Sequence, residues 1–246
     1  MLKKIFIVSV LIFISATTFA ETRTFYFSRH GQRGDPKYQK SFKYCDEDAL
    51  MPNGEEQAKL LGAYMAKLGF KGKIYVSPFY RTLQTASFAA SKMQALPIIL
   101  EPRIQEMTGV KDNTGIVRTT KKCITKKEIK QNFPAVQIPH NVKFPWRVEN
   151  ERQSQLDERI SETIDDMLQN TSGDIFFVCH GGMMPGVIRE MRKRGSDFEK
   201  RNAYNCCLYA FTFDTETKQV IESVDHTLNY LPKELITDNL TYYYKK

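Results

Sequence analysis

The chain has 246 residues, of which 41% are hydrophobic and 26% are charged, close to the composition of an average folded protein. These proportions exclude a disordered tail, a fibrous repeat and a protein with many membrane spans. Lysine and arginine number 36 against 28 acidic residues, and the net charge of +8 favours an anionic partner: a nucleic acid, a membrane surface or a negatively charged substrate.

The first 20 residues have the layout of a secretory signal peptide. Lys3 and Lys4 give a short cationic start, an apolar run covers residues 5–14, and small or neutral residues lead to Ala20. The apolar run is shorter than the roughly 20 residues that a membrane span requires. We expect cleavage after Ala20 and an exported domain, periplasmic or secreted, over residues 21–246. An N-terminal anchor that is kept is the alternative, and no stable membrane insertion is expected once the segment is cleaved.

Strands and helices alternate along the rest of the chain. Hydrophobic patterning predicts strands at 22–28, 73–77, 97–100 and 174–179. Helices are expected from Asn53, from Pro78 to about Ala95, and from about Gln153 to Gln169. Asn53 is the expected N-cap of the first helix, because Glu56 follows three residues later.

The segment from about 107 to 150 is less regular. It holds Pro134, Pro139 and Pro145, so we expect an insertion over one edge of the sheet. Residues 206–213 and 219–224 predict a closing antiparallel pair. The sequence of 21–246 shows neither an internal repeat nor a linker, which indicates one domain. The alternation predicts the α/β class, with a three-layer α/β/α sandwich around a mainly parallel central sheet.

Basic and acidic side chains follow several of the predicted strands, where parallel sheets bind their ligands. They are Arg29, His30, Arg33, Arg81, Glu106 and His180. Guanidinium groups bind the oxygens of a phosphoryl group in pairs, and a neutral imidazole can attack phosphorus. A carboxylic acid can protonate the leaving oxygen and later deprotonate water. Together these residues predict a phosphoryl-transfer site that needs no metal and no other cofactor.

Each of these residues, taken singly, also fits an ordinary structural role. A histidine at the end of a strand is more often structural than catalytic. Arg81 fits a surface helix, Arg33 a solvated loop, and Glu106 an exposed position like most glutamates. Their joint placement after successive strands favours the functional interpretation.

Five motifs, in chain order from residue 25 to about 186, resemble those of a known family. Arg29-His30-Gly31 is the first, and residues 53–58 are similar to a Gly-x-x-Gln-Ala helix start. Residues 77–86 match Ser-Pro-x-x-Arg-x-x-Gln-Thr-Ala, residues 100–106 resemble a stretch that ends in an acid, and residues 178–182 resemble a second histidine motif. The chain therefore resembles the histidine phosphatase superfamily, also called phosphoglycerate-mutase-like.

The resemblance implies a role for each site residue. His30 is the implied nucleophile, Arg29 and Arg81 clamp the phosphate, His180 hydrogen-bonds the phosphoryl oxygens, and Glu106 is the general acid and then base. Glu101 is a nearby competitor for the acid role.

Arg33 is similar to an extra phosphate-binding arginine of acid-phosphatase-like members and of the T-cell-signalling-suppressor phosphatases. The acid-phosphatase branch has a proline where Asp35 stands and an aspartate where Gly181 stands. The chain thus resembles the mutase-like branch, and Arg33 does not fix the substrate.

The sequence beyond residue 20 contains an odd number of cysteines and no CxxC spacing, which argues against a zinc site and a complete disulfide framework. They are Cys45, Cys123, Cys179, Cys206 and Cys207. An exported protein can form disulfides, and Cys45 with Cys123 is one candidate pair because both lie in polar, loop-like sequence. Cys179 lies in an apolar strand and is expected to be a buried thiol.

A local group of basic residues lies in the expected insertion, at Arg118, Lys121, Lys122, Lys126, Lys127 and Lys130. These residues form either a solvated face or a flank that attracts a polyanionic phosphate ester. No nucleic-acid motif accompanies the charge, so nucleic acid is not an expected partner. The oligomeric state stays open.

The predicted function is an exported phosphomonoesterase that acts on a small or polyanionic phosphate ester. A phosphoglycerate-mutase-type phosphotransferase and a non-catalytic phosphate-binding module are the alternatives. A metal-binding protein is disfavoured, because His140 and His226 have no paired spacing.

Overall fold

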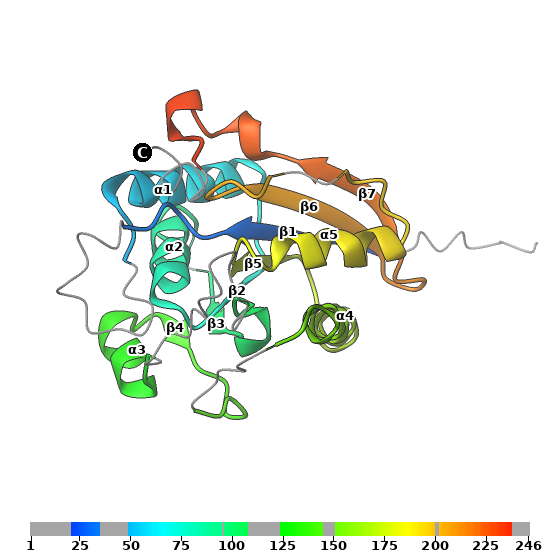
Figure 1. Cartoon of the computed structure of the whole chain (residues 1–246), viewed down its shortest axis with the longest axis horizontal. Helices are drawn as coiled ribbons and strands as arrows, with labels where there is room; N and C mark the ends of the chain where they lie inside the picture. Colours follow the sequence, from blue (N-terminus) through cyan, green and yellow to red (C-terminus); the bar gives the residue numbers. More distant parts are fainter. Residues whose placement is uncertain are drawn as a thin grey trace, which may run out of the picture.

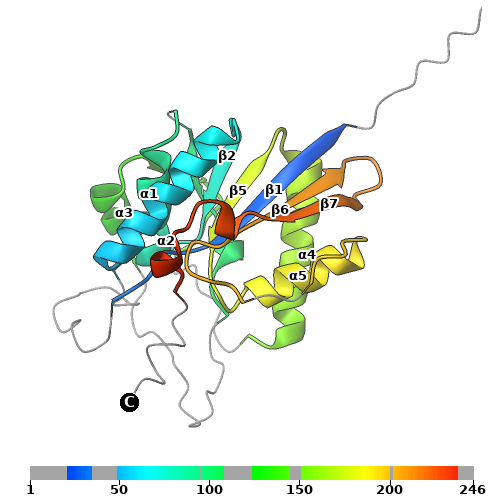
Figure 2. The same ribbon diagram turned by 90° about the horizontal axis from the view of Figure 1, so that it is seen from above.

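The computed structural model describes residues 21–34, 49–94, 96–107, 124–144, 151–199 and 202–237. In this part of the chain, seven strands form one sheet in the order β4-β3-β2-β5-β1-β6-β7. Helices lie on both sides of the sheet, as Figures 1 and 2 show from two directions. The predicted α/β/α sandwich is confirmed.

The sheet is mainly parallel. β1, β2, β3, β4 and β5 run parallel, whereas β6 pairs antiparallel with β1 and β7 pairs antiparallel with β6. The strands are β1 (Thr22–Arg29), β2 (Lys73–Val76), β3 (Ile98–Leu100), β4 (Val136–Gln137), β5 (Ile175–Cys179), β6 (Leu208–Asp214) and β7 (Val220–Asp225). The predicted closing pair is therefore correct.

Two hydrophobic cores separate the sheet from the two helical layers. One core packs Phe25, Phe27 and Phe177 against α4 (Gln153–Asn170) and α5 (Met184–Lys193). The other lies on the opposite face, against α1 (Pro52–Lys67), α2 (Tyr80–Ala90) and α3 (Lys126–Asn132). Side chains alternate between the two faces along each strand, so a strand buried on both sides is apolar throughout. β5 shows this pattern over its whole length.

Three predicted helix boundaries are wrong, one in α1 and both in α2. Asn53 does not cap α1, because the helix begins at Pro52 and its N-cap is Met51, which makes no side-chain cap bond. Proline suits the first helical position, and it keeps the preceding residue extended. α2 begins at Tyr80 instead of Pro78, because Phe79 is extended with φ −87° and ψ 144°, and it ends at Ala90.

The described part of the 107–150 segment lies at the β4 edge of the sheet. It contains α3 and the short strand β4, which pairs with β3. Thr125 caps α3 in a capping box with Glu128, and the buried side chain of Ile129 anchors the helix to the core. Lys126, Lys127 and Lys130 are exposed on α3, whereas Arg118, Lys121 and Lys122 lie outside the described residues. The attraction of polyanions to this segment stays a prediction.

Among the described residues, none of the helices combines the length and the apolar character that a membrane crossing demands. The expected signal peptide lies outside these residues.

Candidate active site

The register of the central strands places the two histidine motifs side by side. β1 and β5 are parallel neighbours with Arg29 opposite Cys179, so His30 and His180 both follow the carboxyl ends of adjacent strands. The His30 N–H donates to the Cys179 carbonyl at 3.0 Å, and the two imidazole rings lie 5.5 Å apart between centroids. β2 flanks β5 on its other side, which brings Ser77 and the start of α2 to the same edge.

The ring of His30 is buried, with 2% of the residue exposed, and it is held in one tautomer. Its Nδ1 lies 2.8 Å from the Gly31 carbonyl oxygen. A carbonyl oxygen only accepts, so Nδ1 carries the proton and Nε2 keeps its lone pair. Burial lowers the pKa of His30 well below its ordinary value, and the charges of Arg81 and Arg29 lower it further. The imidazole is therefore neutral at physiological pH.

The loop after β1 is fixed by close backbone contacts with α1. A Cβ on Gly31 would lie 2.5 Å from the Gly54 carbonyl oxygen, and one on Gly54 would lie 2.1 Å from the Gln32 oxygen. Any side chain at either glycine would push the loop away from the helix. Thr85 accepts a hydrogen bond from the Gly31 N–H at 3.0 Å.

Two buried amide side chains tie this loop to the end of the described chain. Gln57 accepts from the Gln32 N–H at 2.7 Å and donates to the Leu235 carbonyl at 2.7 Å and to Thr237 Oγ1 at 2.9 Å. Asn205 donates to the His30 carbonyl at 3.1 Å, and its own N–H donates to the Thr237 carbonyl. Segments far apart in sequence thus hold the His30 loop together.

His180 is also buried and neutral. The Arg81 guanidinium donates to Nδ1 of His180 at 3.1 Å, so Nε2 carries the proton and donates to the Ser77 hydroxyl at 2.8 Å. Burial lowers the pKa of His180 well below its ordinary value, and the positive charges of Arg81 and Arg29 add to this effect. The Phe79 ring packs against both the imidazole and the Arg81 guanidinium.

Arg29 and Arg33 bring further positive charge to this edge. Arg29 donates to the Ala203 carbonyl at 2.7 Å, and its buried Nε has no hydrogen-bond partner among the described residues. This Nε lies close to Gly181, where an added Cβ would approach it to 2.9 Å. The backbone of Arg33 bridges to Leu50, and its charge contributes to lowering the pKa of Arg29 and His180, after burial as the main cause.

The Glu106 carboxylate faces the His180 motif from the loop after η2 (Pro102–Ile104). Its Oε1 accepts from the Met107 N–H at 3.0 Å, and its Oε2 accepts from the Gly182 N–H at 3.4 Å. An added Cβ on Gly182 would lie 2.5 Å from Oε1, so only glycine leaves the carboxylate in this position. All six predicted site residues therefore lie near one another at the carboxyl ends of the parallel strands.

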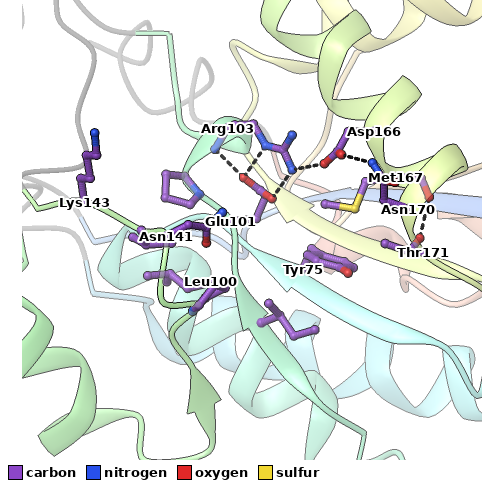
Figure 3. Close-up of a pocket in the computed structure, with 14 residues that line it drawn as sticks. Tyr75, Leu100, Glu101, Arg103, Asn141, Lys143, Asp166, Met167, Asn170 and Thr171 are labelled. Carbon is purple, nitrogen blue, oxygen red and sulfur yellow. Dashed lines mark hydrogen bonds and ion pairs between the residues drawn. The ribbon is translucent and has the colours of Figure 1, made fainter.

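Glu101, the competitor for the acid role, faces a different hollow. Its buried carboxylate accepts from Arg103 through the backbone N–H, Nε and Nη2 at 2.8–2.9 Å, and Arg103 also pairs with Asp166 of α4 at 2.8 Å. These three residues and Tyr75 line a hollow of about 720 Å³ beside α4 (Figure 3). None of the six predicted site residues lines it.

Sequence reasoning gave no role to several residues that hold the site. Gln57, Ser77 and Thr85 lie within the quoted motifs, so the motifs themselves carried the signal. Asn205 had no such signal, because its contact with His30 spans 175 positions of sequence.

The described cysteines are the buried free thiols Cys179, Cys206 and Cys207. The prediction for Cys179 is confirmed. Burial raises the pKa of Cys207 to about 12, so this thiol stays protonated. Cys45 and Cys123, the candidate disulfide pair, lie outside the described residues.

The described residues contain no group of three or more His, Cys, Asp or Glu side chains arranged to hold a metal ion.

Comparison with known proteins adds independent information. The family model of the histidine phosphatase superfamily (branch 1) matches residues 25–226. No curated protein matches the chain in sequence.

Solved structures share the fold at low sequence identity. The ecdysone phosphate phosphatase of Bombix mori, solved with tungstate, has a TM-score of 0.58 and 16% identity over 81% of this chain and 92% of its own. Bacillus stearothermophilus YhfR has a TM-score of 0.55 and 18% identity, covering 80% and 94%. The phosphoserine phosphatase of Entamoeba histolytica, in complex with 3-phosphoglyceric acid, has a TM-score of 0.54 and 18% identity, covering 87% and 100%. With the family model spanning both histidine motifs, the chain belongs to the histidine phosphatase superfamily.

Proposed function

We propose that the protein is an exported phosphomonoesterase that hydrolyses phosphate esters through a phosphohistidine on His30 and needs no metal ion. The neutral, tautomerically fixed imidazole of His30 carries this proposal. Its free Nε2 is a nucleophile at neutral pH, and the surrounding arginines suit a phosphoryl group. Two of the structural relatives are named as phosphatases, which supports hydrolysis. Export rests on the signal-like residues 1–20.

The first chemical step transfers the phosphoryl group to the enzyme. Arg29, Arg33 and Arg81 bind the phosphoryl oxygens. The Nε2–H of His180, which donates to the Ser77 hydroxyl in the free protein, is shared with a phosphoryl oxygen. Nε2 of His30 forms a bond to phosphorus while the bond from phosphorus to the ester oxygen breaks. The carboxylic acid of Glu106 gives its proton to that oxygen, so the alcohol leaves neutral.

The second step regenerates the enzyme. The Glu106 carboxylate takes a proton from a water molecule, whose oxygen attacks phosphorus as the N–P bond breaks. The products are inorganic phosphate and the free imidazole. A mutase would instead pass the phosphoryl group to a second alcohol, so the acceptor of this step separates the two reactions.

The decisive experiment measures turnover and the intermediate together. The purified protein is assayed with p-nitrophenyl phosphate in EDTA and with added divalent metals, and a ³²P-labelled substrate is quenched in alkaline denaturant, where phosphohistidine survives. We expect full turnover in EDTA and label on His30. A metal requirement would contradict the proposed mechanism. Phosphoryl transfer to 3-phosphoglycerate faster than to water would favour a mutase, and absence of turnover would favour a binding module.

The pH profile follows from the lowered pKa values of His30 and His180. Because these imidazoles stay neutral below pH 6.5, the ordinary histidine pKa, kcat/KM should not fall as the pH decreases through 6.5. In the unfolded chain both histidines take up protons below pH 6.5, so the free energy of unfolding should decrease from there towards the folded-state pKa values. The pH dependence of kcat/KM, corrected for substrate ionisation, tests the first expectation. The pH dependence of the urea midpoint tests the second. An acid limb centred at or above pH 6.5 would contradict this assignment.

Ser77→Ala tests the hydrogen bond that orients His180. The change leaves the buried Nε2–H without its acceptor, so we expect kcat/KM to fall by about 10-fold to 100-fold. Ser91→Ala is the matched control, because the exposed Ser91 hydroxyl donates to the Phe88 carbonyl at the end of α2, away from the site. Equal kcat/KM for the two variants would show that Ser77 does not position His180.

A further inference from the structure

An arginine of α4 holds the backbone of the loop that carries Glu106. We propose that Arg159 is a positioning residue for Glu106; the proposal rests on the acid role that the proposed function gives to that carboxylate. Within the described residues, the Arg159 guanidinium makes no hydrogen bond to either histidine motif. It acts from α4 on the acid loop, defined as residues 101–107.

The Arg159 guanidinium divides its donors between the acid loop and a buried carboxylate. Nη1 donates to the Arg103 carbonyl oxygen and, at 3.4 Å, to the Gln105 carbonyl oxygen. Nε and Nη2 bind the two carboxylate oxygens of Glu151 at 2.7 and 2.6 Å. The bidentate pair fixes the plane of the guanidinium and therefore the direction of Nη1.

These contacts reach the peptide group next to the acid. The Gln105 carbonyl belongs to the peptide bond that continues into Glu106, so its orientation sets where the Glu106 side chain starts. Ile104 is fully buried in the core against α4, and Gln105 is also buried. The loop is thus anchored to α4 twice, by the packing of Ile104 and by the hydrogen bonds of Arg159. The carboxylate at its tip reaches the Gly182 N–H.

The pair of Arg159 and Glu151 is buried, with side-chain exposures of 12% and 2%. Burying two charges is costly, and an apolar pair of similar size often stabilises a fold equally well. This ion pair also directs Nη1 of Arg159 towards two carbonyl oxygens of the acid loop, so it can position the loop, which an apolar pair cannot do. A lysine at 159 would keep the charge but could not bind Glu151 in two places and also reach the loop.

The chain offers a matched control for Arg159→Lys. Arg194, the C-cap of α5, is equally buried, with 11% side-chain exposure, and is likewise held by acidic partners, Glu190 and Asp165. In the described part of the chain, its side-chain hydrogen bonds go to Glu190, Asp165 and Ser161, and none reaches the acid loop. Arg194→Lys therefore reports the general effect of weakening a buried arginine pair.

The kinetic test uses the dependence on the leaving group. A displaced acid hurts an alkyl phosphate, whose leaving oxygen needs a proton, far more than p-nitrophenyl phosphate. We expect Arg159→Lys to lower kcat/KM by about 10-fold to 100-fold for an alkyl phosphate and by less than about 3-fold for p-nitrophenyl phosphate. In the Glu106→Gln background, the same change should have no further effect. Equal losses for both substrates, or additive losses with Glu106→Gln, would overturn the proposal.

A second measurement needs no substrate. The Met107 N–H donates to the Glu106 carboxylate, so its hydrogen exchange reports where that carboxylate lies. Exchange should quicken in Arg159→Lys and in Glu151→Gln and stay unchanged in Arg194→Lys. Unchanged exchange in the first two variants would overturn the positioning role even if the wild type hydrolyses phosphate esters. Conversely, failure of the wild type to turn over any phosphate ester would refute the proposed function and leave this exchange result valid.

Discussion

His30→Ala is expected to lower kcat at least about 10³-fold, because the substitution removes the atom that forms the covalent intermediate. The neighbouring ring of His180 cannot take over as the nucleophile, because its Nδ1 accepts from Arg81 and its Nε2 carries a proton. The assay is p-nitrophenyl phosphate hydrolysis together with ³²P labelling, and the variant should show no phosphohistidine.

The same variant separates the nucleophile from the phosphate-binding groups. Arg29, Arg81 and His180 remain in His30→Ala, so inorganic phosphate should still bind and protect the fold against thermal unfolding. His140→Ala is the control, because this exposed histidine lies outside the site and its replacement should leave kcat unchanged. Label in His30→Ala, or turnover within about tenfold of the wild type, would place the nucleophile elsewhere.

Arg23→Met is expected to lower the free energy of unfolding by about 3–5 kcal/mol. The buried Arg23 side chain sits at the carboxyl end of α4 and donates to the carbonyl oxygens of Met167, Leu168, Thr171 and Gly173 at 2.8–3.1 Å. Helix ends leave such carbonyls without internal partners, and a cation there also complements the helix dipole. Methionine fills similar space and satisfies none of them.

The measurement is the urea midpoint of Arg23→Met against Arg192→Met, whose arginine is exposed in the last turn of α5. The control should change the midpoint little. Arg23 lies at the start of β1 and His30 follows its end, so kcat/KM should be retained at temperatures where both variants are folded. An unchanged urea midpoint for Arg23→Met would show that the helix end does not depend on this residue.

The strand ends of the site were predictable from sequence because parallel strands bring their carboxyl ends to one edge. A charged or nucleophilic residue after each apolar run, as at His30 and His180, is therefore visible in the pattern. The motifs added which arginines and which acid belong together. The order of the strands also explains why Arg81, which fits a surface helix in sequence, is buried: β2 lies directly beside β5.

Contacts that depend on long-range packing were not predictable. The bond between Ser77 and His180 needs the pairing of β2 with β5, and the bond between Asn205 and His30 needs the return of the chain after α5. Asn53 failed as a cap because Pro52 took the first helical position, a local preference that outweighed the capping pattern. The role of Arg159 follows from carbonyl directions, which no residue pattern encodes.

The hydrogen bonds that Gln57 makes to two distant segments have a consequence for the order of folding. This one amide joins the loop after β1 to Leu235 and Thr237, so the nucleophile is fixed only when the last described turn of the chain has docked. Contacts between such distant segments form late, because their closure costs the most chain entropy. The loop that carries His30 therefore gains its final position late in folding, after residues 235–237 have docked against Gln57.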